Sequence, residues 1–260
     1  MTIAVRAAAA THVGCIRRTN QDRFRSAAPL FVVADGMGGH AGGERASELA
    51  LSGFDRFNGA AVVERESVVV AVREANAEIR RQAYLEPALE GMGSTVAGIA
   101  LVRDRGLGAL VVFNVGDSRV YRFRDATLEQ ISVDHSVVAD LVAAGQIFPE
   151  QSSTHPERHV LTRALGVSDH LEVDSWLLAP LAGDRFLICS DGLTDEVFDD
   201  RIAVALAAGE LPSDIVDALV ARAVHAGARD NVTALVLDVV ADEDRRTAVD
   251  DHDTLLRDRP

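Results

Sequence analysis

Four aspartates stand at the ends of apolar runs, where a strand would meet a turn or loop. Asp35 and Asp191 each follow such a run and precede a glycine. Asp117 lies in a short turn, and Asp230 comes just before the last apolar run. A carboxylate at a buried strand end costs free energy unless a cation neutralises it. Because clustered carboxylates without histidine or cysteine suit a hard ion, the pattern predicts a magnesium or manganese site.

The same residues have two other interpretations. Aspartate and glycine are common turn formers, and each site taken alone fits an ordinary turn. The glycine-rich stretch at residues 35–43 also follows an apolar run and opens a helical pattern, with Asp55 about 20 residues on, as in dinucleotide-binding loops. Asp35 would repel a pyrophosphate there, and the strands that follow are not separated by helices. These two points disfavour the dinucleotide site.

The sequence offers little support for a nucleophile supplied by the protein. A cysteine phosphatase needs an arginine six residues after its cysteine, but Gln21 follows Cys15 and Asp195 follows Cys189 at that spacing. A G-x-S-x-G elbow fails because Ile188 stands where its first glycine belongs. If the protein is a catalyst, we expect a metal-activated water to be the nucleophile.

Composition narrows the choice of partners. The chain has 260 residues, with 40 acidic and 26 basic side chains and a net charge of −14. All the basic residues are arginine, which excludes the lysine-dependent phosphate-binding loop and lysine Schiff bases. The acidic balance disfavours nucleic acid as a partner, because a phosphate backbone would be repelled.

Location and the two ends of the chain are predicted from simple features. Two cysteines cannot make a disulfide framework and predict a reducing, cytoplasmic location. No run of 18 residues lacks a charged side chain, so we expect no membrane span.

We interpret residues 1–10 as a first strand rather than a signal peptide. Residues 241–260 hold seven acids and four arginines and predict an acidic, disordered tail.

Hydrophobic patterning predicts the elements that must position the aspartates. Apolar runs bounded by Gly, Asp or Asn predict strands at residues 31–34, 95–102, 109–115, 119–123, 186–189 and 232–240. Helical periodicity and end signals predict helices at about 46–57, 68–79, 136–144, 201–208 and 213–226. Turns between residues 94 and 131 are too short for helical crossovers. The sheet there is therefore antiparallel, with helices packed outside it.

Eight short segments stand in the order found in one known family. They are Gly14-x-x-Arg17-x-x-Asn20-Gln21-Asp22, Val33-Ala34-Asp35-Gly36-Met37-Gly38-Gly39-His40, Gly91-Met92-Gly93-Ser94-Thr95, Val115-Gly116-Asp117-Ser118-Arg119, Asp134-His135-Ser136, Leu161-Thr162-Arg163-Ala164-Leu165-Gly166, Cys189-Ser190-Asp191-Gly192-Leu193-Thr194-Asp195 and Gly227-Ala228-Arg229-Asp230-Asn231-Val232-Thr233. Together they resemble the signatures of bacterial type 2C (PPM) metal-dependent Ser/Thr protein phosphatases. The resemblance covers about residues 11–239.

The resemblance implies an α+β fold, a four-layer αββα sandwich of two central antiparallel sheets flanked by helix pairs. It implies two Mn²⁺ or Mg²⁺ ions and a weaker third. Asp35 would bridge the first two ions, and Gly36 would offer its backbone carbonyl. Asp191 and Asp230 would complete the first site. Asp117, with Asp191, would hold the third ion.

Further roles follow by position from the same resemblance. Arg17 matches the arginine that grips the substrate phosphate, and its fork suits two phosphate oxygens. Asp22 and Asn231 would orient metal-bound water from behind the ligands. Gln21 departs from the glutamate of many relatives, so direct carboxylate ligation there is lost.

The proton donor and the segment beside the site are less well specified. Met37 stands where eukaryotic members place a histidine proton donor, which leaves nearby His40 and a metal-bound water as the candidates. The family has a mobile flap beside the active site, and residues 137–163 correspond to it. An ordinary surface loop is the alternative for that segment. The phosphatase domain would span residues 1–240.

We therefore expect a cytoplasmic, monomeric phosphoprotein phosphatase in which a water between two metal ions attacks phosphoserine or phosphothreonine. Its substrates would include a bacterial Ser/Thr kinase that it opposes. A non-catalytic pseudophosphatase is a rival, weakened because no metal-position aspartate is missing. The other rival is a partner-switching phosphatase for an anti-sigma antagonist, but such relatives usually carry sensor or kinase modules.

The two cysteines give a first test of the mechanism. Cys15→Ser and Cys189→Ser should leave the rate of p-nitrophenyl phosphate hydrolysis nearly unchanged, because neither thiol has the arginine loop that thiolate chemistry needs. Steady-state kinetics of both folded variants measures this. A loss of more than about a hundredfold in folded Cys15→Ser would restore a cysteine mechanism.

Overall fold

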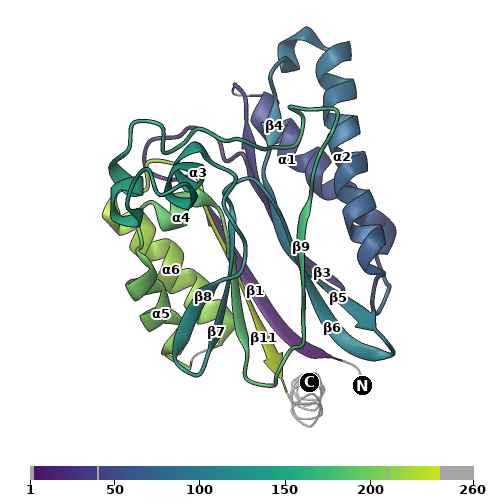
Figure 1. The fold of residues 1–260 in the computed structure, drawn as a ribbon, viewed down its shortest axis with the longest axis vertical. Helices are drawn as coiled ribbons and strands as arrows, with labels where there is room; N and C mark the ends of the chain where they lie inside the picture. The colour runs from purple at the N-terminus through teal and green to yellow at the C-terminus, as the bar shows by residue number, and fades with distance from the viewer. Residues whose placement is uncertain (1–2, 40, 210, 241–260) are drawn as a thin grey trace, which may run out of the picture.

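Two antiparallel sheets stack face to face in the computed structural model, which describes residues 3–39, 41–209 and 211–240 (Figure 1). The strands are β1 (Ala4–His12), β2 (Asp22–Ala27), β3 (Leu30–Met37), β4 (Gly93–Ser94), β5 (Val96–Asp104), β6 (Leu107–Val115), β7 (Arg119–Arg124), β8 (Thr127–Gln130), β9 (Asp174–Leu178), β10 (Arg185–Cys189) and β11 (Val232–Val240). One sheet has the order β1-β11-β10-β7-β8. The other has the order β2-β3-β5-β6-β9, with β4 paired to β3 outside this path.

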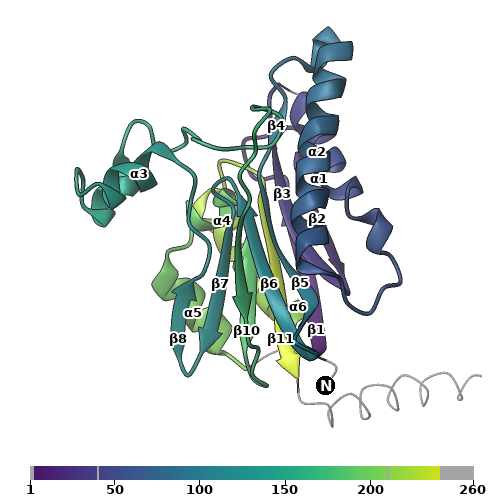
Figure 2. The ribbon, with the colours of Figure 1, turned by 45° about the vertical axis from the view of Figure 1, so that its right-hand side comes forward.

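Helices cover the outer face of each sheet, as Figures 1 and 2 show. The α-helices are α1 (Gly42–Ser52), α2 (Arg65–Leu85), α3 (Val137–Ala143), α4 (Asp191–Thr194), α5 (Asp199–Ala207) and α6 (Pro212–Ala226), with 3-10 turns at Asp55–Phe57, Pro87–Leu89 and Pro149–Thr154. Side chains of α1 and α2 pack on the sheet that contains β3, and those of α5 and α6 pack on the sheet that contains β11. The predicted four-layer αββα sandwich is confirmed.

The core follows from this layering. Three apolar clusters fill the molecule, one under each helix pair and one between the two sheets. In β3, Leu30 and Val32 face the helices while Phe31 and Val33 face the other sheet. A strand buried on both faces is apolar throughout, which explains why its sequence is a continuous apolar run. Asp35 continues the face of Phe31 and Val33, toward the gap between the sheets.

The strand predictions succeed for the central strands and for the edge strand β1, and they miss the other three edge strands. The six apolar runs match strands, although Thr95 lies just outside β5. β2 and β8 were not predicted because their sequences are mostly polar and show no clear alternation, and β9 was not predicted because its apolar run is only three residues long. β3 also runs past Asp35 to Met37, because Gly36 and Met37 pair with β4. Pairing partners, not local sequence, decide these boundaries.

The segment at residues 137–163 is mostly helical turns and loop. α3 follows Ser136, whose Oγ accepts a hydrogen bond from the amide of Ala139 at 3.3 Å, so the predicted helix is confirmed. Figure 2 shows α3 standing away from the two sheets. No helix among the described residues is long and apolar enough to cross a lipid bilayer. His40 and the predicted tail at residues 241–260 lie outside the described residues.

Apolar side chains between the two sheets should contribute strongly to stability. Phe186 is fully buried there, so Phe186→Ala should lower the free energy of unfolding by about 3–5 kcal/mol. Urea denaturation of the two proteins measures the difference. Phe148→Ala is the matched control, because this side chain is 72% exposed and its loss should change stability by less than about 0.5 kcal/mol.

Candidate metal centre

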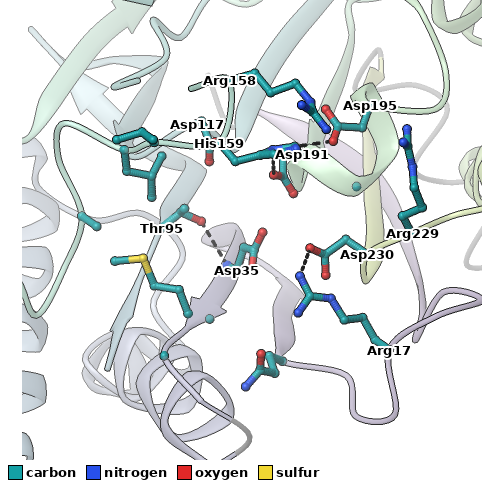
Figure 3. A pocket seen from close by; sticks show the side chains of 18 of the residues that line it. Arg17, Asp35, Thr95, Asp117, Arg158, His159, Asp191, Asp195, Arg229 and Asp230 are labelled. Atoms are coloured by element: carbon teal, nitrogen blue, oxygen red, sulfur yellow. Dashed lines mark hydrogen bonds and ion pairs between the residues drawn. The ribbon is translucent and has the colours of Figure 1, made fainter. Parts of the chain in front are cut away.

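A cavity of about 880 Å³ brings the four predicted aspartates together. Asp35 comes from β3, Asp117 from the turn between β6 and β7, Asp191 from the first turn of α4, and Asp230 from the loop before β11. Figure 3 shows these carboxylates turned toward a common space. Residues far apart in the chain therefore form one acidic site.

The glycines after Asp35 and Asp191 are required by close packing of the backbone. A Cβ at Gly36 would lie 1.9 Å from the carbonyl oxygen of Gly43, and one at Gly192 would lie 2.0 Å from that of Asn231. Gly36 lies inside β3 and Gly192 inside α4, and neither backbone has a positive φ. The interpretation of the two Asp-Gly pairs as simple turns is therefore wrong.

Asp22 lies behind the cavity and joins the two sheets. It is buried, stands opposite Asp35 in the pairing of β2 with β3, and is not among the residues that line the cavity. Its Oδ2 accepts hydrogen bonds from Ser190 Oγ and Thr233 Oγ1, both at 2.7 Å. Ser190 follows β10 and Thr233 lies in β11, and both strands belong to the sheet that does not contain β2. This carboxylate fixes the distance between the two halves of the site.

Thr95 holds the backbone of Asp35 from the other side. Its Oγ1 accepts a hydrogen bond from the Asp35 amide at 3.0 Å, and its own amide donates to the Asp35 carbonyl at 2.8 Å. The same hydroxyl lies 2.7 Å from Ser118 Oγ, next to Asp117. Two of the aspartates thus share one hydrogen-bonded support.

Burial and mutual repulsion make the ionised cluster unstable by itself. Burial raises the pKa of Asp35 and of Asp191 well above the usual value, and repulsion from the neighbouring carboxylates raises both further. Burial also raises the pKa of Asp117 to about 7 and that of Asp22 to about 6. A cation bound among these carboxylates would compensate their charge.

The donor set fits magnesium or manganese. All four predicted ligand side chains offer oxygen, which these hard ions prefer. Oδ1 of Asp191 is buried and has no hydrogen-bond partner among the residues that the structure describes. A buried acceptor without a donor is costly, and a metal ion would satisfy it.

Arg17 reaches the site from the loop after β1. Its Nη2 donates to Asp230 Oδ2 at 2.5 Å, and its side chain is half exposed at the cavity. Asn231 keeps this loop in place, because its Oδ1 accepts from the Gln21 amide and its Nδ2 donates to the carbonyls of Val13 and Thr19. The amide of Asn231 also donates to Asp230 Oδ1 at 2.8 Å.

The sequence analysis missed two residues at the site. His159 Nδ1 lies 3.9 Å from Asp191 Oδ2 and 3.8 Å from Asp195 Oδ2, and the three side chains are close enough to hold a metal ion together. Asp195 follows Asp191 by four residues, a spacing that places both on one helical face. In the sequence, His155 and His159 stand four residues apart and suggest a zinc pair, but no third ligand accompanies them there. The structure instead places His159 beside Asp191 and Asp195.

Comparisons with known proteins agree with the geometry. The sequence model described as protein phosphatase 2C matches residues 17–234. The serine/threonine protein phosphatase PstP of Mycobacterium tuberculosis is 39% identical over 245 residues, which cover 92% of this chain and 46% of that protein. This chain thus spans about half the length of that relative. The serine/threonine phosphatase stp of Listeria monocytogenes is 34% identical over 243 residues, 88% of this chain and 93% of that protein.

Solved structures give the same result. The crystal structure of M. tuberculosis PstP superposes with a TM-score of 0.83 at 37% identity, covering 92% of this chain and all of that one. The PstP catalytic domain in complex with two manganese ions gives a TM-score of 0.81 at 36% identity, with 92% of this chain and all of that one covered.

The raised pKa values predict an unusual pH dependence of stability. Between the unfolded pKa of 3.8 and the folded values of about 6 and 7, Asp22 and Asp117 bind more protons in the folded state. Metal-free protein should therefore lose stability as pH rises from about 5 to 8, seen as a fall of several degrees in Tm. Thermal melts with chelator measure this.

Saturating manganese should flatten that slope, since the ion stabilises the ionised form and binds only the folded state. Asp117→Asn, which cannot ionise, should make the slope shallower without metal, because Asp22 still titrates. A metal-free wild type that becomes more stable across this range would contradict the electrostatic account.

Proposed function

Because the chain belongs to the protein phosphatase 2C family, we propose that it hydrolyses phosphoserine and phosphothreonine in proteins with the aid of Mn²⁺ or Mg²⁺. The observation that carries this is the meeting of Asp35, Asp117, Asp191 and Asp230 in one cavity with Arg17 at its side. The four carboxylates come from separate segments, and their mutual repulsion destabilises the metal-free fold, so a structural role alone does not account for their meeting.

Within this proposal, Asp35 would be a ligand shared by two ions, and Gly36 would offer its carbonyl oxygen. Asp191 and Asp230 would complete the first site, and Asp117 with Asp191 would hold a weaker third ion. Ions bound there polarise phosphoryl oxygens and lower the pKa of bound water. Asp22 keeps the β2–β3 edge at a fixed distance from Ser190, so the carboxylate of Asp35 is held in place before any ion or substrate arrives.

Arg17 binds the substrate phosphate in this mechanism. A guanidinium carries five N–H donors, and Asp230 accepts from only one nitrogen of Arg17 in the described structure. The other N–H groups of this half-exposed guanidinium face the cavity and can donate to two phosphate oxygens. The ion pair with Asp230 also orients the fork before substrate binds. His40 and a metal-bound water stay our two candidates for the proton donor to the leaving oxygen.

We also propose a cellular location, an oligomeric state and partners for the protein. Both cysteines are free, and Cys15 is exposed, which supports a reducing cytoplasm. We propose a monomer that opposes a bacterial Ser/Thr kinase and acts on phosphoproteins, among them that kinase. The pseudophosphatase alternative is disfavoured because every predicted metal-binding aspartate lines the cavity. No observation favours the partner-switching alternative.

A charge-removing variant tests the proposal. Asp35→Asn keeps the size of the side chain but lacks the charge that would bridge two ions, so hydrolysis of a phosphoserine peptide should fall at least about 100-fold. Calorimetric titration with manganese should show loss of the ion pair, and metal-free Asp35→Asn should melt above metal-free wild type because a repelled carboxylate is gone.

Asp104→Asn is the matched control, since Asp104 is exposed at the end of β5, and it should behave as wild type. Wild-type activity should also disappear with excess EDTA. Full activity in EDTA, or an Asp35→Asn protein that binds two ions and hydrolyses the peptide as wild type does, would refute the proposed function.

A further inference from the structure

Gln21 lies at the end of the loop that carries Arg17, where this loop meets the glycine-rich segment after β3. The side-chain Nε2 of Gln21 donates a hydrogen bond to the carbonyl of Gly39 at 2.8 Å. Both residues line the cavity, so the bond lies in the cavity wall. It connects two segments that are 18 residues apart in the chain.

The backbone of Gln21 is held from two further directions. Its amide donates to Asn231 Oδ1 at 2.8 Å, next to Asp230. Its carbonyl accepts a hydrogen bond from Ser47 Oγ of α1 at 2.6 Å, and Ser47 is fully buried. The side-chain amide of Gln21 is therefore presented to Gly39 from a backbone that has little freedom to move.

The glycine-rich segment packs closely against Gln21. A Cβ at Gly43 would lie 2.6 Å from Gln21 Nε2, and one at Gly36 would lie 2.9 Å from the Gln21 carbonyl oxygen. Gly38 and Gly39 both have a positive φ, so the chain bends sharply between β3 and α1. The Gly43 amide also donates to the Gly39 carbonyl, at 3.5 Å, so Gln21 makes the shorter of these two bonds.

We infer that Gln21 is a positioning residue that holds the glycine-rich segment, and with it the Gly36 carbonyl, against the cavity. The inference rests on the proposed function for the role of that carbonyl as an ion ligand. In this assignment Gln21 acts through the segment and not as a ligand itself.

The contact with Gly39 requires a donor at position 21. An ionised glutamate there would place a carboxylate oxygen against the Gly39 carbonyl oxygen, and both are acceptors. The glutamine that stands where many relatives have a glutamate therefore has a role of its own in this chain.

Hydrogen exchange of the metal-free protein tests the contact. Gln21→Met keeps the length of the side chain but has no N–H donor, and Gln21→Glu offers only acceptors near neutral pH. In EDTA, amides within residues 36–43 should exchange about fivefold faster in both variants than in wild type, the factor that corresponds to one hydrogen bond of typical strength. Mass spectrometry of peptic peptides measures these rates. Exchange within α6 should stay unchanged, which separates a local effect from general destabilisation.

Manganese binding gives a second measurement. Gln21→Met should bind manganese chloride about tenfold more weakly in calorimetric titration, since partners behind a ligand typically contribute a factor of this size. Gln21→Glu serves only the exchange experiment, because its added charge attracts the cation directly. Gln146→Met is the matched control, since Gln146 is exposed and does not line the cavity. It should exchange and bind manganese as wild type does.

Specific results would overturn the inference. Unchanged exchange within residues 36–43, or unchanged manganese affinity, in Gln21→Met would do so. Wild-type exchange in Gln21→Glu would show that no donor is required, and equal acceleration within α6 would show that Gln21 acts only through global stability. Failure of the proposed function is a separate result, because it would appear as a wild type that binds manganese and keeps its slow exchange but hydrolyses no phosphopeptide.

Discussion

At one end of the sandwich, Asp35, Asp117, Asp191 and Asp230 repel one another across a shared cavity, and burial removes much of the water that would screen them. Left alone, such a cluster would open the fold. It persists because each aspartate is attached to an element whose apolar side chains are buried in the sandwich, so repulsion at the rim acts against packing in the core. The same repulsion would favour the binding of divalent cations.

Two sheets must meet at a fixed distance for this cluster to form. Asp22 sets that distance, because its carboxylate accepts hydrogen bonds from Ser190 and Thr233 while its strand pairs with the strand of Asp35. The hydroxyls keep a buried charge tolerable, although its pKa is still raised to about 6. Asp22 therefore links the two sheets directly behind the proposed metal site. A substitution of Asp22 would change both the contact between the sheets and the position of Asp35.

The segment at residues 137–163 adds the basic side chains of Arg158 and His159 to the lining of the cavity. His159 approaches Asp191 and Asp195 from this segment, and Figure 3 shows Arg158 beside it. Both ends of the segment meet at His135, whose carbonyl accepts a hydrogen bond from the amide of Thr162 at 2.9 Å.

By itself, the sequence determined the central architecture and predicted the metal chemistry. Apolar runs that end at Asp35 and Asp191 identified central strands, because burial on both faces leaves a continuous apolar signal that needs no partner to be recognised. The aspartates at their ends were predicted as oxygen ligands. Only the tertiary structure decided the edge strand that carries Asp22, the pairing of Arg17 with Asp230, and the approach of His159. It also showed that Gly36 and Gly192 are required by neighbouring carbonyls rather than by turns. These features depend on contacts between residues distant in the chain, and such contacts leave no periodic trace in the local sequence.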